Sequence, residues 1–305
     1  MGRRKKGRDI SGILLLDKPL GFSSNGALQR VKRMFGANKA GHTGALDPLA
    51  SGMLPICLGE ATKFSSYLLD ANKCYTATCK LGQTTTTGDA EGEVVQQRPV
   101  EVYNDDLLAR LVEKFSGEIE QIPPMYSALK HNGQPLYKLA RKGEEIERKS
   151  RRITIVDLEI LRYQGDELDI RVHCTKGTYI RTLAEDIGEF LGCGAHLIAL
   201  HREWVAGFKD HPMISLELVE QLAEQGHDKL DENLLPMETA LKDFPQVELS
   251  ADASFYICRG QQVFVANSPS SGLLRLYSHE KAFLGLGEIQ SDGKIAPKRL
   301  ISSGE

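Results

Sequence analysis

Short segments with a two-residue hydrophobic period constrain the fold of this chain more than any other feature. Apolar and polar side chains alternate over residues 74–81, as they do along a β-strand that buries one face. Further strands are expected at 153–160 and 168–174, and the apolar run 13–16 is typical of a buried strand that ends in a turn. Strands outnumber helices and the two occur in mixed order. This pattern predicts an α+β domain built on a mixed, mainly antiparallel sheet.

Helical spacing recurs between these strands. Ser23 or Ser24 can cap a helix that Gly36 closes. Two further helices are expected at 105–115 and 178–191, where apolar residues follow the 3.6-residue period.

The C-terminal part has the composition of a small β-rich unit. Residues 255–265 and 273–289 predict short strands separated by glycine and serine. The acidic stretch 210–245 before them predicts connecting helices. At this length we expect one large domain over residues 1–245 and a small domain over 246–305.

Charge is unevenly distributed along the chain. Residues 1–60 hold ten Lys/Arg against four Asp/Glu, and residues 210–245 hold two against nine. Five of the basic residues form an arm over residues 1–8. Between residues 130 and 152, eight basic residues stand against three acidic ones, with glycine and proline between them, which predicts a mobile, cationic insertion. A polyanion such as RNA therefore becomes a candidate partner.

The six cysteines are scattered, without a C-x-x-C pair or a cluster with histidine. This argues against a zinc site and against a disulfide framework, and we expect reduced thiols in a cytoplasmic protein. No run of 18 apolar residues follows the basic arm or occurs elsewhere, so neither export nor membrane insertion is expected.

The most informative stretch is 41–55, which contains three glycines and two prolines around Asp47. So many breakers predict an irregular loop, not a long helix or a central strand. Pro48 biases Asp47 away from helical geometry, and the glycines allow the backbone to approach a ligand closely. A carboxylate is thereby fixed on a loop.

This stretch resembles the central motif of the TruB family of pseudouridine synthases. Five more segments resemble that family in the same order along the chain, and chance could hardly supply all six. They are Leu16-Asp17-Lys18-Pro19-Leu20-Gly21, Lys73-Cys74-Tyr75, Gly88-Asp89-Ala90-Glu91-Gly92, Ile122-Pro123-Pro124-Met125-Tyr126-Ser127-Ala128 and Cys174-Thr175-Lys176-Gly177-Thr178-Tyr179-Ile180-Arg181.

The resemblance implies an isomerase that converts uridine to pseudouridine at position 55 in the T-loop of tRNA. It also implies a thumb-like insertion at about 130–152 and a C-terminal PUA-like, RNA-binding domain. The chemistry cleaves the N-glycosidic bond, rotates the base and rejoins it through carbon, so we expect no metal and no organic cofactor. The resemblance also implies an enzyme that requires no protein partner and can act as a monomer, although the sequence does not fix the oligomeric state. The partner is then the T-arm of tRNA, with its uridine flipped out of the loop.

By the same resemblance Asp47 is the catalytic nucleophile. Its carboxylate can attack the ribose or the base, or can abstract a ribose proton to give a glycal, and the sequence does not distinguish these routes. Arg181 is the cation that keeps Asp47 ionised. Tyr75 stacks on the flipped base, Tyr179 contacts it and can take the proton from C5, and His42 fills the space that the base leaves.

Two further residues are expected to support the site. Leu200 packs near the uracil, and Lys18 shapes the site loop or is only a charge at a strand end. The family commonly has two arginines after the leucine, where this chain has His201 and Arg202, which puts a secondary RNA contact or a structural pairing in doubt.

Two other functions compete with this interpretation. An RNA-binding or RNA-folding module without chemistry would explain the charge distribution, but it would not need Asp47, Tyr75, Tyr179 and Arg181 together. A nucleotide-dependent RNA modifier such as a methyltransferase would need a glycine-rich cofactor loop between a strand and a helix, and the sequence contains no G-x-G-x-x-G.

Overall fold

The computed structural model describes residues 7–302, and its main element is a sheet of nine strands. These strands are β1 (Gly12–Lys18), β2 (Ala40–His42), β3 (Ala50–Leu58), β4 (Lys73–Leu81), β7 (Gly117–Gln121), β10 (Arg151–Gln164), β11 (Glu167–Cys174), β12 (Ala195–Val205) and β13 (Ile214–Ser215). Their order is β13-β1-β3-β12-β4-β11-β10-β7, with β2 paired to β3. The β1/β13 and β3/β12 pairs are parallel and the others antiparallel, which confirms the predicted mixed, mainly antiparallel sheet.

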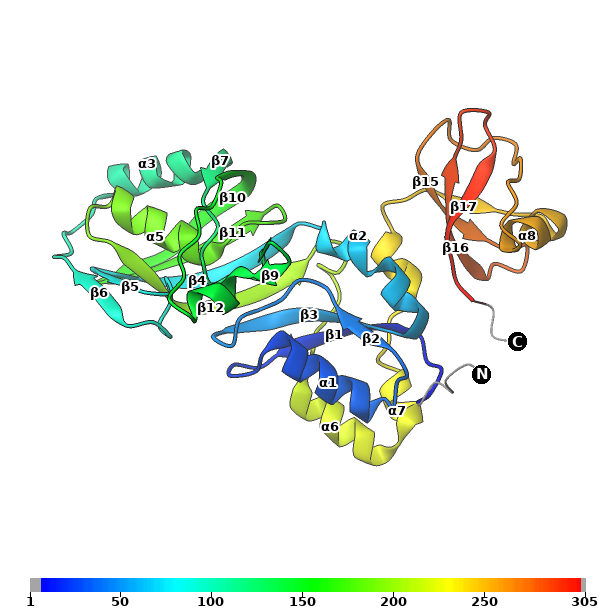
Figure 1. The fold of residues 1–305 in the computed structure, drawn as a ribbon, viewed down its shortest axis with the longest axis horizontal. Coiled ribbons are helices and arrows are strands. Elements are labelled where there is room, and N and C mark those ends of the chain that lie inside the picture. The colour runs from blue at the N-terminus through cyan, green and yellow to red at the C-terminus, as the bar shows by residue number, and fades with distance from the viewer. Residues whose placement is uncertain (1–6, 303–305) are drawn as a thin grey trace.

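Helices cover the two halves of this sheet separately (Figure 1). The half that contains β4, β10 and β11 packs against α3 and α5, and the half that contains β1 and β3 packs against α1, α6 and α7. The helices are α1 (Ser24–Met34), α2 (Ser65–Leu69), α3 (Asp105–Phe115), α4 (Leu136–Ala140), α5 (Ile180–Phe190), α6 (Leu216–Gln225), α7 (His227–Asp231) and α8 (Ala251–Cys258), with 3-10 helices η1 (Gly59–Phe64) and η2 (Met237–Leu241).

Strand β1 is buried on both faces because it has a core on each side. Leu14 and Leu16 point into the core under α1 and α6, whereas Ile13 and Leu15 point into a second core that includes Phe208. Alternate side chains thus serve two cores, which explains why this strand is an uninterrupted apolar run and not an alternating one.

The predicted helices are confirmed within a few residues. Ser23 caps α1 by accepting a hydrogen bond from Gly26 N at 3.0 Å, and Gly36 follows the helix with a positive φ of 58°. Helix α3 has the predicted bounds, and α5 begins at Ile180, two residues later than expected, because Tyr179 is still extended at φ −105° and ψ 110°.

The prediction that 41–55 contains no central strand is wrong for its second half. Residues from Ala50 onward form β3, which lies between β1 and β12. The carbonyl of Pro55 accepts a hydrogen bond from Thr43 N at 3.1 Å. In a strand the nitrogen and the carbonyl of one residue point to the same side, so the Pro55 nitrogen faces the edge of β3 that pairs with β12 and β2. On that side β12 pairs only as far as Gly52 and β2 only from Ile56, so no N–H is required at Pro55.

The C-terminal part forms its own sheet, in the order β14 (Gln246–Glu248), β15 (Leu273–Tyr277), β16 (Phe283–Ile289) and β17 (Ile295–Leu300). Figure 1 shows it, in orange to red, as a separate unit beside the large sheet. The expected strands at 273–289 are confirmed, but the strand predicted at 255–265 is wrong because residues 251–258 form α8. Ser250 caps this helix through Ala253 N at 3.2 Å, and Ile257 and Ala253 face its core four residues apart.

An aromatic cluster joins this unit to η1 and α2 of the large domain. The rings of Phe64 and Phe283 lie 5.7 Å apart, and those of Tyr67 and Phe244 lie 5.5 Å apart. Both distances are typical of ring pairs that contribute packing energy beyond their buried area.

The basic insertion is partly folded. Residues 130–152 contain the short pair β8 (Lys130–His131) and β9 (Gln134–Pro135) and the helix α4, on which Leu136 and Leu139 are buried. Residues 141–150 carry neither helix nor strand. A second small hairpin is formed by β5 (Gln83–Thr85) and β6 (Val94–Gln97).

Most of the predicted basic arm, residues 1–6, lies outside the described residues. Among the helices of residues 7–302, none is both long and apolar enough to span a bilayer.

Candidate active site

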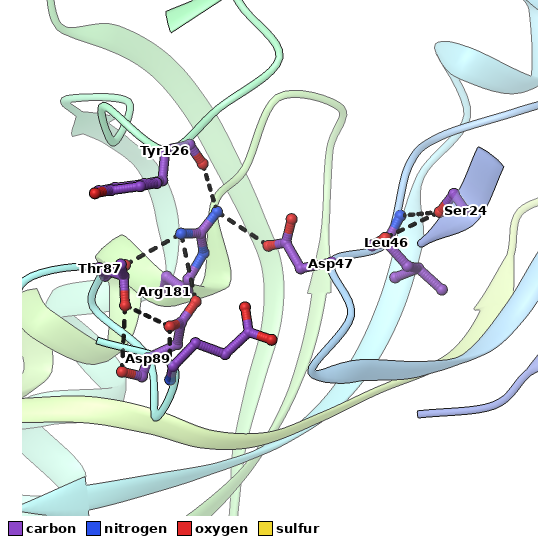
Figure 2. A network of polar contacts seen from close by, with 8 residues as sticks. Ser24, Leu46, Asp47, Thr87, Asp89, Tyr126 and Arg181 are labelled. Atoms are coloured by element: carbon purple, nitrogen blue, oxygen red, sulfur yellow. Dashed lines mark hydrogen bonds and ion pairs between the residues drawn. The ribbon is translucent and has the colours of Figure 1, made fainter. Parts of the chain in front are cut away.

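The loop that carries Asp47 connects β2 to β3, and it is held from the side of α1. Ser24 Oγ donates to Leu46 O at 2.9 Å and accepts from Leu46 N at 2.7 Å, so one hydroxyl binds both polar groups of the residue before Asp47 (Figure 2). On the other side of the aspartate, Gly21 N donates to Pro48 O at 2.8 Å. The backbone around Asp47 is thereby fixed by two contacts to the segment 21–24.

Arg202 holds the same loop from the sheet. Its side chain is buried, and it donates from Nε to Met53 O at 2.7 Å and from Nη2 to Gly44 O at 2.9 Å. Gly52 lies opposite Arg202 with φ +99°, and a Cβ at that position would overlap the Arg202 carbonyl. Glycine is therefore required there both for its conformation and for the close approach of β12.

Arg181 lies between two carboxylates near the N-terminus of α5. Its Nη2 is 3.0 Å from Asp47 Oδ2, and its Nη1 is 3.4 Å from Asp89 Oδ2. The same guanidinium donates to Thr87 O at 3.1 Å and to Tyr126 O at 2.7 Å (Figure 2). The side chains of Arg181 and Asp89 are 8% and 3% exposed, whereas that of Asp47 is 49% exposed. Asp47 is thus the member of this network that a ligand can reach.

A cavity of about 300 Å³ opens in front of Asp47. Five of the predicted residues line it, namely Asp47, Tyr75, Tyr179, Arg181 and Leu200, and they come from a loop, β4, the start of α5 and β12. Arg202 and Lys73 also line it. The cavity contains a carboxylate, aromatic surfaces and fixed cations, which suits a planar polar ligand such as a nucleobase.

Burial controls the protonation of the two tyrosines. Desolvation raises the pKa of Tyr75, which the neighbouring Arg202 guanidinium partly opposes. Desolvation likewise raises the pKa of Tyr179. Both phenols are therefore protonated at neutral pH and can donate a hydrogen bond.

Lys73 belongs to the wall of the cavity for a different reason. Its ammonium donates to Leu69 O at 2.8 Å and to Ala71 O, and burial together with Arg202 lowers its pKa to about 8. It therefore orders the segment 69–71 at the rim, a role that no pattern in the sequence predicts.

Two predicted residues lie outside the lining of this cavity. Lys18 is buried and donates to Pro19 O at 2.8 Å and to Phe22 O at 2.7 Å, so it closes the turn after β1, and burial lowers its pKa to about 8. His42 lies on β2, where burial, and after it the charge of Arg202, lowers its pKa. Within the described residues its buried Nδ1 has no hydrogen-bond partner.

Two further carboxylates, Glu185 and Asp186, lie about one turn after Arg181 on α5. Desolvation, and then the neighbouring Asp186, raises the pKa of Glu185 to about 7. Desolvation raises the pKa of Asp186 to about 6. Gly88 passes so close to Glu185 that a Cβ would lie 2.8 Å from Oε1.

Sequence reasoning missed the residues that hold the site together. Asp89 lies within a segment that resembled the family, so a signal for it was present, but it carried no assigned role. In the sequence Arg202 stands out only as part of a departure from the family pattern. In the structure it is buried and binds the carbonyls of Met53 and Gly44. Its neighbour His201 contacts Ser51 Oγ through Nδ1 at 2.9 Å. No pattern in the sequence marked Ser24 as more than a possible cap.

A larger hollow of about 540 Å³ lies beside Pro48 and is lined by Thr76, Thr78 and His201. Leu200 is the only one of the predicted site residues that lines it. Across residues 7–302, no three His, Cys, Asp or Glu side chains gather as metal ligands would.

Comparison with known families matches nearly the whole chain. Residues 32–180 match the TruB family pseudouridylate synthase N-terminal domain, residues 181–242 match the tRNA pseudouridylate synthase B C-terminal domain, and residues 245–301 match the C-terminal domain of pseudouridine synthase II TruB.

Curated relatives and solved structures agree with these matches. The tRNA pseudouridine synthase B of Nitrosococcus oceani is 57% identical, with 99% of this chain and 98% of the relative covered. That of Vibrio cholerae serotype O1 (strain M66-2) is 54% identical, with both chains fully covered. A chain of a Cbf5-Nop10-Gar1 complex is similar with a TM-score of 0.72 and 27% identity, covering 96% of this chain and 84% of that one.

Proposed function

Because the chain belongs to the TruB family of pseudouridine synthases, we propose that it acts on uridine 55 in the T-loop of tRNA, with Asp47 as its nucleophile. The chain is an isomerase that converts uridine to pseudouridine in tRNA. The position of the uridine, the flipping of the base and the role of each residue are the parts proposed here.

One observation carries the proposal: an accessible carboxylate faces a buried guanidinium at the wall of a cavity. Arg181 is held by Asp89 and by two carbonyls, so it keeps its place whether or not Asp47 remains paired with it. It can therefore stabilise the ionised Asp47 in the free enzyme and remain in position when Asp47 moves to the substrate.

The cavity walls support binding of a single flipped base. Tyr75 offers a ring for stacking, Leu200 adds apolar surface, and Tyr179 presents a protonated phenol. In its ground state Tyr179 is a hydrogen-bond donor, so as acceptor of the C5 proton it would first have to release its own. Lys18 supports the site loop, and His42 occupies the place of the flipped base in the RNA.

The reaction breaks the bond between N1 and C1′ and forms a bond between C5 and C1′. The C5 proton is lost and N1 gains a proton, so the change is an isomerisation without net redox or group transfer. Asp47 can form a transient bond to C1′ or to the base, or remove the C2′ proton to give a glycal, and all three routes need the ionised carboxylate.

The rest of the chain supplies RNA contacts. Residues 130–152 and the basic segment 1–60 provide cations for the phosphates of the T-arm, and residues 246–305 form a PUA-like domain that adds contacts outside the catalytic domain, residues 1–245. The enzyme acts as a monomer without a protein partner. All six cysteines lie within the described residues and are free thiols, which suits the reducing cytoplasm.

Incubation of the purified chain with an unmodified tRNA transcript tests this proposal. Pseudouridine should form at the T-loop uridine without any added protein or cofactor, and a transcript with cytidine at that position should remain unmodified. Pseudouridine at another position of the same tRNA, or dependence on a second protein, would contradict it.

A further inference from the structure

The backbone of Tyr179 is bound by a side chain that has no part in the proposed chemistry. Gln121 is the last residue of β7 and is buried. Its Nε2 donates to Tyr179 O at 3.0 Å, and its Oε1 accepts from Tyr179 N at 2.9 Å. One amide thus binds both polar groups of the Tyr179 backbone.

This contact fixes the residue from which α5 starts. Tyr179 precedes the first helical residue, and no side chain caps the helix there. The Tyr179 carbonyl also accepts the first helical hydrogen bond, from Leu183 N at 3.0 Å. Gln121 therefore fixes the direction in which the chain enters α5, and with it the orientation of the Tyr179 side chain toward the cavity.

The same contact connects the insertion to the site. Five residues after Gln121, Tyr126 O accepts a hydrogen bond from Arg181 Nη2 at 2.7 Å, and Arg181 follows Tyr179 by two residues. The entry of the insertion and the start of α5 are thus joined at two points. Arg148, at the far end of the insertion, reaches the same segment through Pro123 O at 3.3 Å.

We infer that Gln121 is a positioning residue, which sets Tyr179 and, through the start of α5, Arg181 in place. The inference rests on the proposed contact of Tyr179 with the uracil. A carboxamide is needed because it donates and accepts at once, whereas an ionised carboxylate only accepts and a thioether does neither to any useful extent. Asparagine is one carbon shorter and cannot span the same two contacts.

Two variants of the full-length chain test the inference on unmodified tRNA. Gln121→Met keeps the length of the side chain, and we expect kcat to fall about 10- to 100-fold with KM within about twofold, as for a displaced catalytic group. In Gln121→Glu the rate relative to wild type should rise as the pH falls from about 8 to about 5.5, since a protonated carboxyl again donates and accepts. A purely structural role would lower stability without this pH profile.

The exposed Gln97 in β6 provides the control, because Gln97→Met should leave kcat and KM unchanged. Two outcomes would overturn the inference and leave the proposed function standing. One is a flat pH profile for Gln121→Glu. The other is a Gln121→Met rate within twofold of wild type when Tyr179→Leu is impaired. Wild-type rates in Tyr179→Leu would instead overturn the proposed uracil contact, and the route through Tyr179 with it. If Gln121→Met does not fold, the profile of Gln121→Glu decides.

Discussion

Arg181 Nη2 lies 3.0 Å from Asp47 Oδ2, although the guanidinium is almost fully buried and the carboxylate is half exposed. A nearly immobile cation thus faces an anion that solvent and substrate can reach. The pair is asymmetric, because Arg181 keeps three other partners when Asp47 turns away from it.

The first prediction concerns Asp47 itself. Asp47→Asn keeps the size of the side chain but removes its charge, so turnover should fall by at least about a thousandfold. Affinity for tRNA should stay near that of wild type, because phosphate contacts elsewhere supply most of it. Both are measured on the same unmodified tRNA, with circular dichroism to confirm folding and mass spectrometry to exclude deamidation. Near-normal turnover would return the assignment to an RNA-binding role or to another catalytic residue.

Tyr75 should act mainly through its ring. Tyr75→Phe is expected to keep much of the binding and some turnover, whereas Tyr75→Leu should lose most activity, because stacking on a base contributes about 1–3 kcal/mol. Steady-state rates of the three proteins on one tRNA give the comparison. Equal activity of wild type and Tyr75→Leu would remove Tyr75 from the base-binding role.

Arg202 should be needed for stability as well as for activity. Arg202→Met removes the donors to Met53 O and Gly44 O and should lower the free energy of unfolding by about 2–5 kcal/mol. Arg171→Met on β11 is the matched control, since Arg171 forms exposed ion pairs and should cost less than about 1 kcal/mol. Urea unfolding of both variants measures the difference, and equal losses would show that the buried arginine does not hold the loop.

Glu185 should make stability depend on pH. Its folded pKa of about 7 lies above the ordinary value of 4.5, so the folded state binds the proton more tightly and loses stability as the pH rises from about 4.5 to 7. Glu185→Gln should lack this loss and become more stable relative to wild type by on the order of 1–3 kcal/mol near pH 8. Unfolding at a series of pH values checks the sign, and a difference that does not change with pH would contradict the burial of an ionisable Glu185.

The insertion should contribute salt-dependent affinity. Replacing residues 141–149 by a short Gly-Ser linker removes four basic residues from the segment without helix or strand. Binding of tRNA should weaken and its salt dependence should flatten, while the melting temperature changes little. Lys229→Gln on the acidic surface of α7 serves as control. Unchanged affinity and salt slope would assign the insertion to something other than RNA contact.

Much of the fold follows from local periodicity, because one buried face suffices to define a strand such as β4 or a helix such as α3. The errors lie where long-range contacts decide. Pro55 is part of β3 because of a gap between its neighbours β12 and β2, which no local pattern encodes. The apolar residues near Phe255 fit both a strand and a helix. They form a helix, which Ser250 caps by accepting a hydrogen bond from Ala253 N.

The same division holds for the site. Asp47, Tyr75, Tyr179 and Arg181 were predicted because they stand in recognisable motifs, and the structure brings them to one cavity. Ser24, Arg202 and Gln121 act on backbone groups of residues that are distant in sequence. Their function depends on the fold and not on their neighbours, so a motif alone does not mark them.

The two hydrogen bonds of Arg202 also bear on how the protein is made. They span 149 and 158 residues, so the loop around Asp47 cannot be completed until β12 has been synthesised and paired. Contacts of such high sequence separation form late in folding. A nascent chain that stops before Arg202 should therefore be inactive even though it already contains Asp47, Tyr75, Tyr179 and Arg181, and catalytic activity reports that β12 has paired within the large sheet.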